Sequence, residues 1–170
     1  FSSFKGEEAG MMAGVAVAYE RGNWNAGANN GVKEFGITGD FTWDFGGASL
    51  FASAVWVNTD NPNVDDTANP WGVSVQGGYF VTEEAELFAR YEYINFDTPG
   101  GGDTSKYNGL TFGANYFFAK GVKATVDFTY NLKSLSGDSA SAALNGAGLR
   151  QDINGEDGQW ALRAQLQLLF

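Results

Sequence analysis

Apolar and polar residues alternate over the last stretch of the chain. From Trp160 to Phe170, the even-numbered positions are all apolar, while the odd-numbered ones include Arg163 and two glutamines. A period of two predicts a β-strand with one apolar face and one wet face. Strands in globular proteins usually run about 5–6 residues, whereas this pattern lasts for ten or more. A strand of this length and polarity is typical of one that crosses a membrane with its apolar face toward lipid.

The same period recurs along the chain and predicts eight strands in all. The predicted strands cover residues 11–21, 33–45, 48–58, 71–81, 85–96, 107–118, 122–133 and the final stretch from 160 to 170. In most of them the apolar set is rich in aromatic and branched side chains, as expected of a lipid-facing surface. The strand 48–58 differs, because it leaves Phe51, Val55 and Val57 on the face that is polar elsewhere.

The connections between these strands alternate in length. Tight turns are predicted at 46–47, 82–84 and 119–121, and long connections at 22–32, 59–70, 97–106 and 134–157. Short turns at one end and long loops at the other predict an all-β, transmembrane antiparallel outer-membrane β-barrel, with the short turns and both termini on the periplasmic side. A soluble β-sandwich is the alternative, and it would need a second sheet to cover the aromatic face.

Aromatic residues gather near the two ends of the predicted strands, where membrane barrels carry girdles. The two predicted girdles are Phe45, Tyr79, Phe118 and Phe170 at the short-turn end, and Tyr19, Phe35, Trp56, Trp71, Tyr93, Tyr130 and Trp160 at the long-loop end.

The wet faces of the strands supply candidate pore-lining residues. They are Glu34, Asp40, Asp44, Glu86, Arg90, Glu92, Asn115, Lys123, Asp127, Lys133 and Arg163. Acids outnumber bases in this set by six to four, which predicts a mild cation preference if these strands form the whole pore. The simpler interpretation is that these side chains only keep the barrel interior wet. In a narrow, closed barrel they would instead have to pair with one another.

Composition excludes several other classes of protein. No apolar run reaches the roughly 18 residues of a membrane-spanning helix. The 170-residue chain has no cysteine and no histidine, so thiol and Ser-His catalysis are excluded, and it offers no cofactor motif. Its net charge of −10 argues against nucleic acid as a partner. The sequence therefore does not predict an enzyme.

One acidic loop is a weak candidate for a calcium site. Asp152, Asn154, Glu156 and Asp157 lie within seven residues of one another, but their spacing is one residue off the calcium-loop pattern and no closing glutamate follows. Ordinary turn chemistry explains the same residues. No metal is therefore predicted.

The first and last residues of the sequence lead to two expectations, one about processing and one about assembly. The chain begins at Phe1 without an initiator methionine, which fits processing or truncation. It ends on Phe170, which resembles the terminal aromatic signature of bacterial outer-membrane barrels. The resemblance implies that Phe170 is an assembly signal read by the barrel-assembly machinery.

The amino-acid sequence of the predicted strands over roughly 70–170 resembles the phosphate-selective porin O and P family. The resemblance is carried by Glu86-Leu-Phe-Ala-Arg-Tyr-Glu92, by Leu110-Thr-Phe-Gly-Ala-Asn-Tyr-Phe117 with Lys120-Gly-Val-Lys-Ala-Thr-Val-Asp-Phe128, and by the closing strand. It implies a sixteen-stranded, usually homotrimeric channel in the outer-membrane lipid of a Gram-negative-type bacterium. The motifs match the C-terminal half of that family, and the lysine-rich constriction of its phosphate-specific members is absent.

Two readings of the chain follow. In the first, the 170 residues form the C-terminal half of a larger porin, a passive and weakly selective water-filled channel for small solutes or ions. In the second, they form a closed eight-stranded barrel with a structural or surface-binding role and no conductance. The family resemblance favours the first reading, and the even strand number favours the second.

Overall fold

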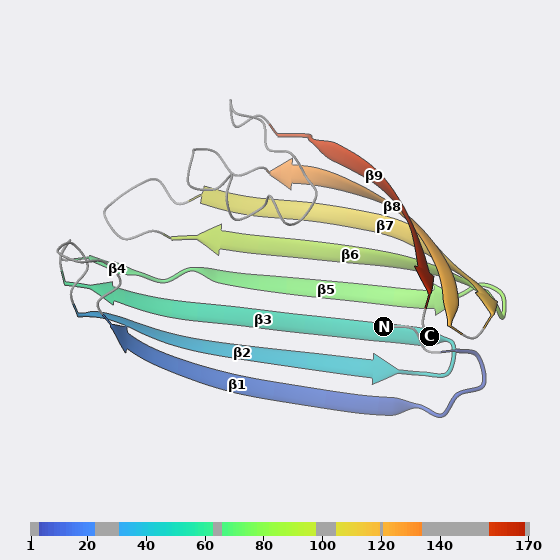
Figure 1. Cartoon of the computed structure of the whole chain (residues 1–170), viewed down its shortest axis with the longest axis horizontal. Helices are drawn as coiled ribbons and strands as arrows, with labels where there is room; N and C mark the ends of the chain where they lie inside the picture. The colour runs from blue at the N-terminus through green and yellow to red at the C-terminus, as the bar shows by residue number, and fades with distance from the viewer. Residues whose placement is uncertain are drawn as a thin grey trace.

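The structure is a computed structural model, and it describes residues 4–22, 31–62, 66–97, 105–119, 121–133 and 157–168. These residues form one curved antiparallel sheet, which Figure 1 shows as an open trough. Its strands are β1 (Gly10–Gly22), β2 (Val32–Asp44), β3 (Ala48–Asn61), β4 (Asp66–Ala68), β5 (Trp71–Phe80), β6 (Ala85–Phe96), β7 (Ser105–Ala119), β8 (Val122–Lys133) and β9 (Trp160–Leu168).

The long strands lie in the sheet in chain order. The order is β1-β2-β3-β5-β6-β7-β8-β9, and the short β4 pairs only with β3. Within the described residues, β1 and β9 each have a single hydrogen-bonded neighbour, so the sheet is not closed. They form its opposite edges in Figure 1.

All eight predicted strands are present, with boundaries that move by a few residues. The tight turn after β2 is also as predicted. Gly46 and Gly47 both have positive φ, at 71° and 123°, and the Phe45 amide donates to the Ala48 carbonyl at 2.8 Å. Glycine adopts these angles without the steric cost that a side chain would bring. The prediction that 59–70 is entirely a connection was wrong, because β3 continues to Asn61 and pairs with β4.

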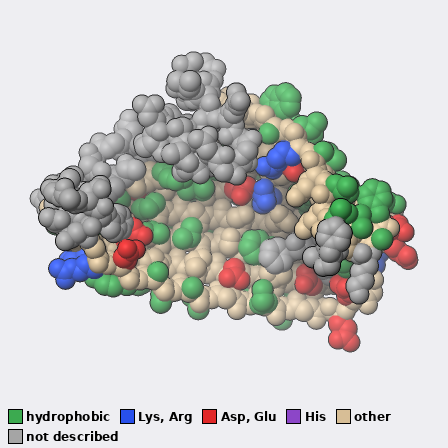
Figure 2. Space-filling model, viewed as in Figure 1, with side chains coloured by type: hydrophobic (Ala, Val, Ile, Leu, Met, Phe, Trp, Pro, Cys, Tyr) green, Lys and Arg blue, Asp and Glu red, His purple; other side chains and the backbone are tan. Residues whose placement is uncertain are grey.

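The strand register gives the sheet one polar and one apolar face. Across β5, β6, β7 and β8, for example, Gln76 pairs with Arg90, Arg90 with Thr111, and Thr111 with Thr129, all on the inner face. Figure 2 shows acidic and basic side chains gathered on this hollowed face.

Burial among the described residues is inverted relative to a water-soluble domain. The buried polar residues are Thr42, Ser49, Glu86, Thr111, Asn115, Thr129 and Asn131, whereas the buried hydrophobic ones are Val32, Ala68, Phe80 and Tyr107. Large apolar side chains on the outer face, such as Phe112 and Leu162, are exposed. The described part of the chain holds one sheet only, so no second layer covers these side chains as a β-sandwich requires.

Aromatic side chains meet on the outer face near both ends of the strands. At the long-loop end the rings of Trp71 and Tyr93 lie 5.0 Å apart, and at the short-turn end those of Tyr116 and Phe118 lie 4.9 Å apart. Trp71 and Tyr79 are the aromatic residues near the two ends of β5. The eight residue steps from one to the other span roughly 26 Å along the strand, or about 20 Å across a bilayer at a tilt near 40°. This spacing fits an apolar band of roughly 25 Å.

The described residues include no helix with the length and apolarity that a membrane crossing requires.

Candidate functional site: the polar inner wall

The centre of the site is an ion pair between the last two strands. Asp127 on β8 lies directly opposite Arg163 on β9 in the register. The guanidinium donates to the Asp127 Oδ1 atom from both Nε, at 2.8 Å, and Nη2, at 2.6 Å. Nη2 also donates to the hydroxyl of Thr129 at 3.1 Å. The pair is shielded on the carboxylate side, where Asp127 is 15 % exposed, and open to solvent on the arginine side.

A chain of hydroxyl groups continues from this pair across the wall. Thr129 and Thr111 face each other on β8 and β7, and their Oγ1 atoms lie 2.9 Å apart in a hydrogen bond. Both side chains are buried. Each hydroxyl can donate and accept, so the two threonines satisfy each other in a place where an unpaired polar group would be costly.

A second polar chain lies closer to the short turns. The Thr125 hydroxyl donates to Asn115 Oδ1 at 2.6 Å, and Asn115 Nδ2 donates to Glu86 Oε2 at 2.7 Å. Glu86 is 1 % exposed and therefore belongs to the wall itself. It was predicted to line the pore, but its carboxylate is committed to the hydrogen-bond network beneath the surface.

Three further charged side chains reach the open surface of the wall. Arg90 Nε donates to Glu92 Oε2 at 3.1 Å within β6, and both side chains are about one-third exposed. Lys123 on β8 has its ammonium 5.8 Å from the centre of the Phe117 ring. Among the described residues, no carboxylate lies within salt-bridge distance of Lys123.

These groups surround a cavity of about 640 Å³ on the inner face. It is lined by Gln76, Phe88, Arg90, Thr111, Asn115, Lys123, Thr125, Asp127, Arg163, Ala164 and Gln165. The lining combines hydroxyl, amide and charged groups of both signs, most of which already have a protein partner. A lining of this kind keeps the cavity hydrated.

The other half of the inner wall is acidic. Glu34, Asp40 and Asp44 all lie on β2, and each is half-buried. Glu34 accepts a hydrogen bond from the Thr59 hydroxyl at 3.4 Å. Asp40 belongs to the same cross-strand row as Ser53, since the two are register partners. The structure thus places the predicted acids of β2 and the predicted bases Arg90, Lys123 and Arg163 on one face but on different strands.

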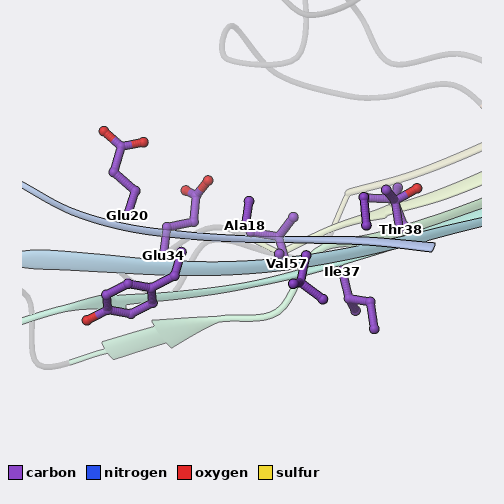
Figure 3. Close-up of a pocket in the computed structure, with 11 residues that line it drawn as sticks. Ala18, Glu20, Glu34, Ile37, Thr38 and Val57 are labelled. Carbon is purple, nitrogen blue, oxygen red and sulfur yellow. The ribbon is translucent and has the colours of Figure 1, made fainter.

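Glu20 adds to this acidic half and was not among the predicted pore-lining residues. It lies opposite Glu34 in the β1–β2 register, and Figure 3 shows both carboxylates projecting from the same face of the sheet. The surrounding cavity of about 570 Å³ also includes Ile37, which projects from the other face. The lining of this cavity comes from β1, β2 and β3.

Lys133 departs from its predicted position. Simple alternation places it on the inner face, but a register shift between Asn108 and Gly109 pairs Lys133 with Asn108. Asn108 in turn pairs with Tyr93 on the outer face. The β-bulge thus removes Lys133 from the inner row, because one extra residue reverses the facing of those beyond it.

Some predicted residues lie outside the described residues. These are Phe170 and three members of the calcium candidate, Asp152, Asn154 and Glu156. The fourth member, Asp157, is described. Within the described ranges, no group of three or more acidic residues is arranged to hold a metal ion.

Sequence reasoning missed the contacts that organise the wall. Nothing in the sequence signalled that Thr111 and Thr129 form a buried pair. Sequence reasoning also did not single out the inward aromatic rings of Phe80, Phe88 and Phe117. In all these cases the deciding factor is which residues stand opposite each other on neighbouring strands.

Comparison with known proteins gives a match in architecture. No family model matches the chain, and no curated protein matches it. Among solved structures, it is similar to outer-membrane expressed OmpT of Vibrio cholerae, with a TM-score of 0.56 and 15 % sequence identity. The fold is that of an outer-membrane β-barrel wall. The match covers 94 % of this chain and 49 % of the OmpT chain, so this sheet spans about half the length of its structural neighbour.

The ion pair on β8 and β9 leads to a first prediction. Replacing Arg163 by methionine should lower the free energy of unfolding by about 1–2 kcal/mol, because Asp127 then loses a partly shielded partner. Urea unfolding of the protein in lipid vesicles measures the change. In a double-mutant cycle with Asp127→Asn, the two losses should be clearly less than additive. Full additivity would show that the pair contributes no coupling.

Proposed function

We propose that the protein is an outer-membrane porin that forms a passive, weakly selective, water-filled channel for small solutes or ions. The observation that carries this proposal is the polarity of the single curved sheet. Its concave face holds hydroxyl, amide and charged groups, and its convex face exposes aromatic and aliphatic side chains. Only an environment that is wet inside and apolar outside satisfies both faces.

The location rests on three observations together. The outer face carries aromatic contacts near both ends of the strands, the distance between these ends suits a bilayer, and the fold resembles that of an outer-membrane protein. An outer-membrane location also sets a requirement for the free edges of β1 and β9. Unpaired backbone groups are not tolerated in lipid, so both edges must be paired in the membrane.

A wide barrel suits the inner wall better than a closed eight-stranded one. The interior of an eight-stranded barrel is filled by side chains. Here Arg90, Glu92 and Lys123 are only half-buried, and Arg90 and Lys123 line the same cavity on the inner face. The resemblance to the phosphate-selective porin O and P family supports a sixteen-stranded channel, which in that family is usually a trimer. We therefore propose that further strands complete the barrel.

The inner charges support weak selectivity. Asp127 and Glu92 have arginine partners, and Glu86 is buried in a hydrogen-bond network. Pairing of this kind cancels much of the field that each charge would otherwise exert on a passing ion. The acids of β2 are left to dominate the remaining field, which favours cations slightly.

Planar-bilayer recording of the natural full-length protein tests the proposal. We expect stepwise conductance and, under a salt gradient, reversal potentials that show a small cation preference. A well-folded protein without any conductance steps would refute the channel and favour the closed structural barrel. The mass of the native polypeptide gives an independent check, because a closed barrel made from this chain alone has a mass near 18.2 kDa. Strong anion selectivity would contradict the predicted charge balance.

A further inference from the structure

Three aromatic rings occupy the short-turn end of the inner wall, where a water-filled lumen predicts polar side chains. Phe80 pairs with Glu86 in the register and Phe117 pairs with Lys123, so both rings are on the inner face. The ring of Phe4, from the segment before β1, lies 4.9 Å from each of them. Phe80 is completely buried as a result. The segment before β1 thus covers an apolar patch that would otherwise face the lumen.

This segment, residues 4–9, is held in a defined shape by its own backbone. The Glu7 amide donates to the Phe4 carbonyl at 3.2 Å, and Gly6 has a φ of 85°. A bond between positions one and four with positive φ at position three is typical of a type II turn. The Phe4 amide also donates to Glu7 Oε2 at 3.1 Å, which closes the turn from the other side.

Contacts with two different turns hold this segment against the wall. Lys5 Nζ donates to the Val81 carbonyl, just after β5, at 3.3 Å. A Cβ atom added to Gly46 would lie 2.6 Å from the Glu7 carbonyl oxygen, and one added to Gly47 would lie 3.1 Å from Lys5 Cγ. The segment therefore lies directly against the β2–β3 turn. Figure 1 shows it turning back from the start of β1 across the ends of the neighbouring strands.

We propose that residues 4–9 form an inner strap that narrows the short-turn mouth of the channel, with Phe4 as the residue that sets its width. This inference rests on the proposed channel function. The strap runs across the inner face from the sheet edge at β1 to β5 and β7, so it takes up part of the cross-section that solutes use. Its anchor is the aromatic contact, and its shape comes from the turn at Gly6.

Four variants of the full-length protein test the strap in planar bilayers. Phe4→Ser removes the anchor ring, and Gly6→Val strains the turn without removing a contact, because no atom lies within 4 Å of a Cβ at this position. Both should raise single-channel conductance roughly 1.5-fold, since conductance follows the open width of a constriction. Gly6→Asn, which tolerates positive φ, and Glu8→Gln should leave conductance unchanged. Heat-dependent migration in gel electrophoresis verifies that each variant is folded.

Proteolysis gives a readout that does not depend on conduction. Trypsin cleaves after Lys5, and a docked strap should protect this bond in the folded protein. We expect cleavage to be roughly tenfold faster in Phe4→Ser and Gly6→Val than in the controls, because the bond must leave its packed position to be cut. If the wild type conducts and all four variants conduct equally, the strap does not set the width of the channel. If the wild type does not conduct, the proposed function fails instead, and proteolysis still reports whether the strap is docked.

Discussion

Replacing Val75 by lysine is expected to lower the free energy of unfolding in a lipid bilayer by about 2–4 kcal/mol. Val75 lies in the middle of β5 on the outer face, where its side chain is 43 % exposed. At that depth the surrounding medium is hydrocarbon, which does not solvate an ammonium group. In water the same substitution would be close to neutral, because the position is open and unpacked.

The next residue along β5 supplies the matched control. Gln76 has the same depth but faces inward, as its register partner Arg90 does. Gln76→Lys should therefore change stability by less than about 0.5 kcal/mol. Urea titration of both variants in vesicles, followed by tryptophan fluorescence, measures the difference between them. Equal costs for the two lysines would mean that the two faces of the sheet meet similar environments, which the membrane proposal does not allow.

Replacing Gly113 by valine is expected to be the most damaging change within the wall. Gly113 lies on β7 beneath the side chain of Phe88, and an added Cβ would overlap that ring. The same Cβ would lie 2.8 Å from the Val126 carbonyl oxygen, which belongs to the sheet and cannot move away. Overpacking of this kind costs typically about 1–3 kcal/mol, and the backbone contact places this variant at the upper end.

Gly36→Val is the matched control for this overpacking. It adds the same side chain to a strand glycine whose Cβ would meet nothing closer than 3.9 Å. The two variants are compared by urea unfolding in vesicles, and Gly113→Val should lose clearly more stability. Phe88→Ala should restore part of the loss at Gly113, but not all, because the Val126 oxygen remains. If the two glycines tolerate valine equally well, close packing at Gly113 is not what stabilises β7.

The strands could be predicted because each of them carries the alternation of apolar and polar residues along its own sequence. A strand between lipid and water needs this alternation along its whole length. Strand β8 can therefore be predicted from sequence alone, because Lys123, Asp127 and Thr129 stand between apolar neighbours. The turn at Gly46 and Gly47 can be predicted equally well, because few other residues adopt its backbone angles. The same information fixes which side chains face inward for most of the wall.

The features that the sequence did not predict depend on how segments meet. Strand β4 has only three residues, too few for a period to emerge. Lys133 follows a bulge whose position depends on the pairing of β7 with β8, not on either strand alone. The same is true of the Asp127–Arg163 pair, because the two residues are 36 positions apart and become neighbours only in the correct register. The inner strap could not be predicted from local sequence either, because Phe4 contacts aromatic rings on β5 and β7, which are far away along the chain.

The plain strand order of the sheet has a consequence for how such proteins change over evolutionary time. Each long strand pairs with the next long strand along the chain. A hairpin is therefore a self-contained unit that pairs with one antiparallel strand on each side. Duplicating or deleting one hairpin would leave the pairing of every other strand intact. The number of strands in a barrel built in this way can therefore change by two at a time during evolution. The barrel becomes wider or narrower, while the strands that remain keep their sequence pattern and pairing.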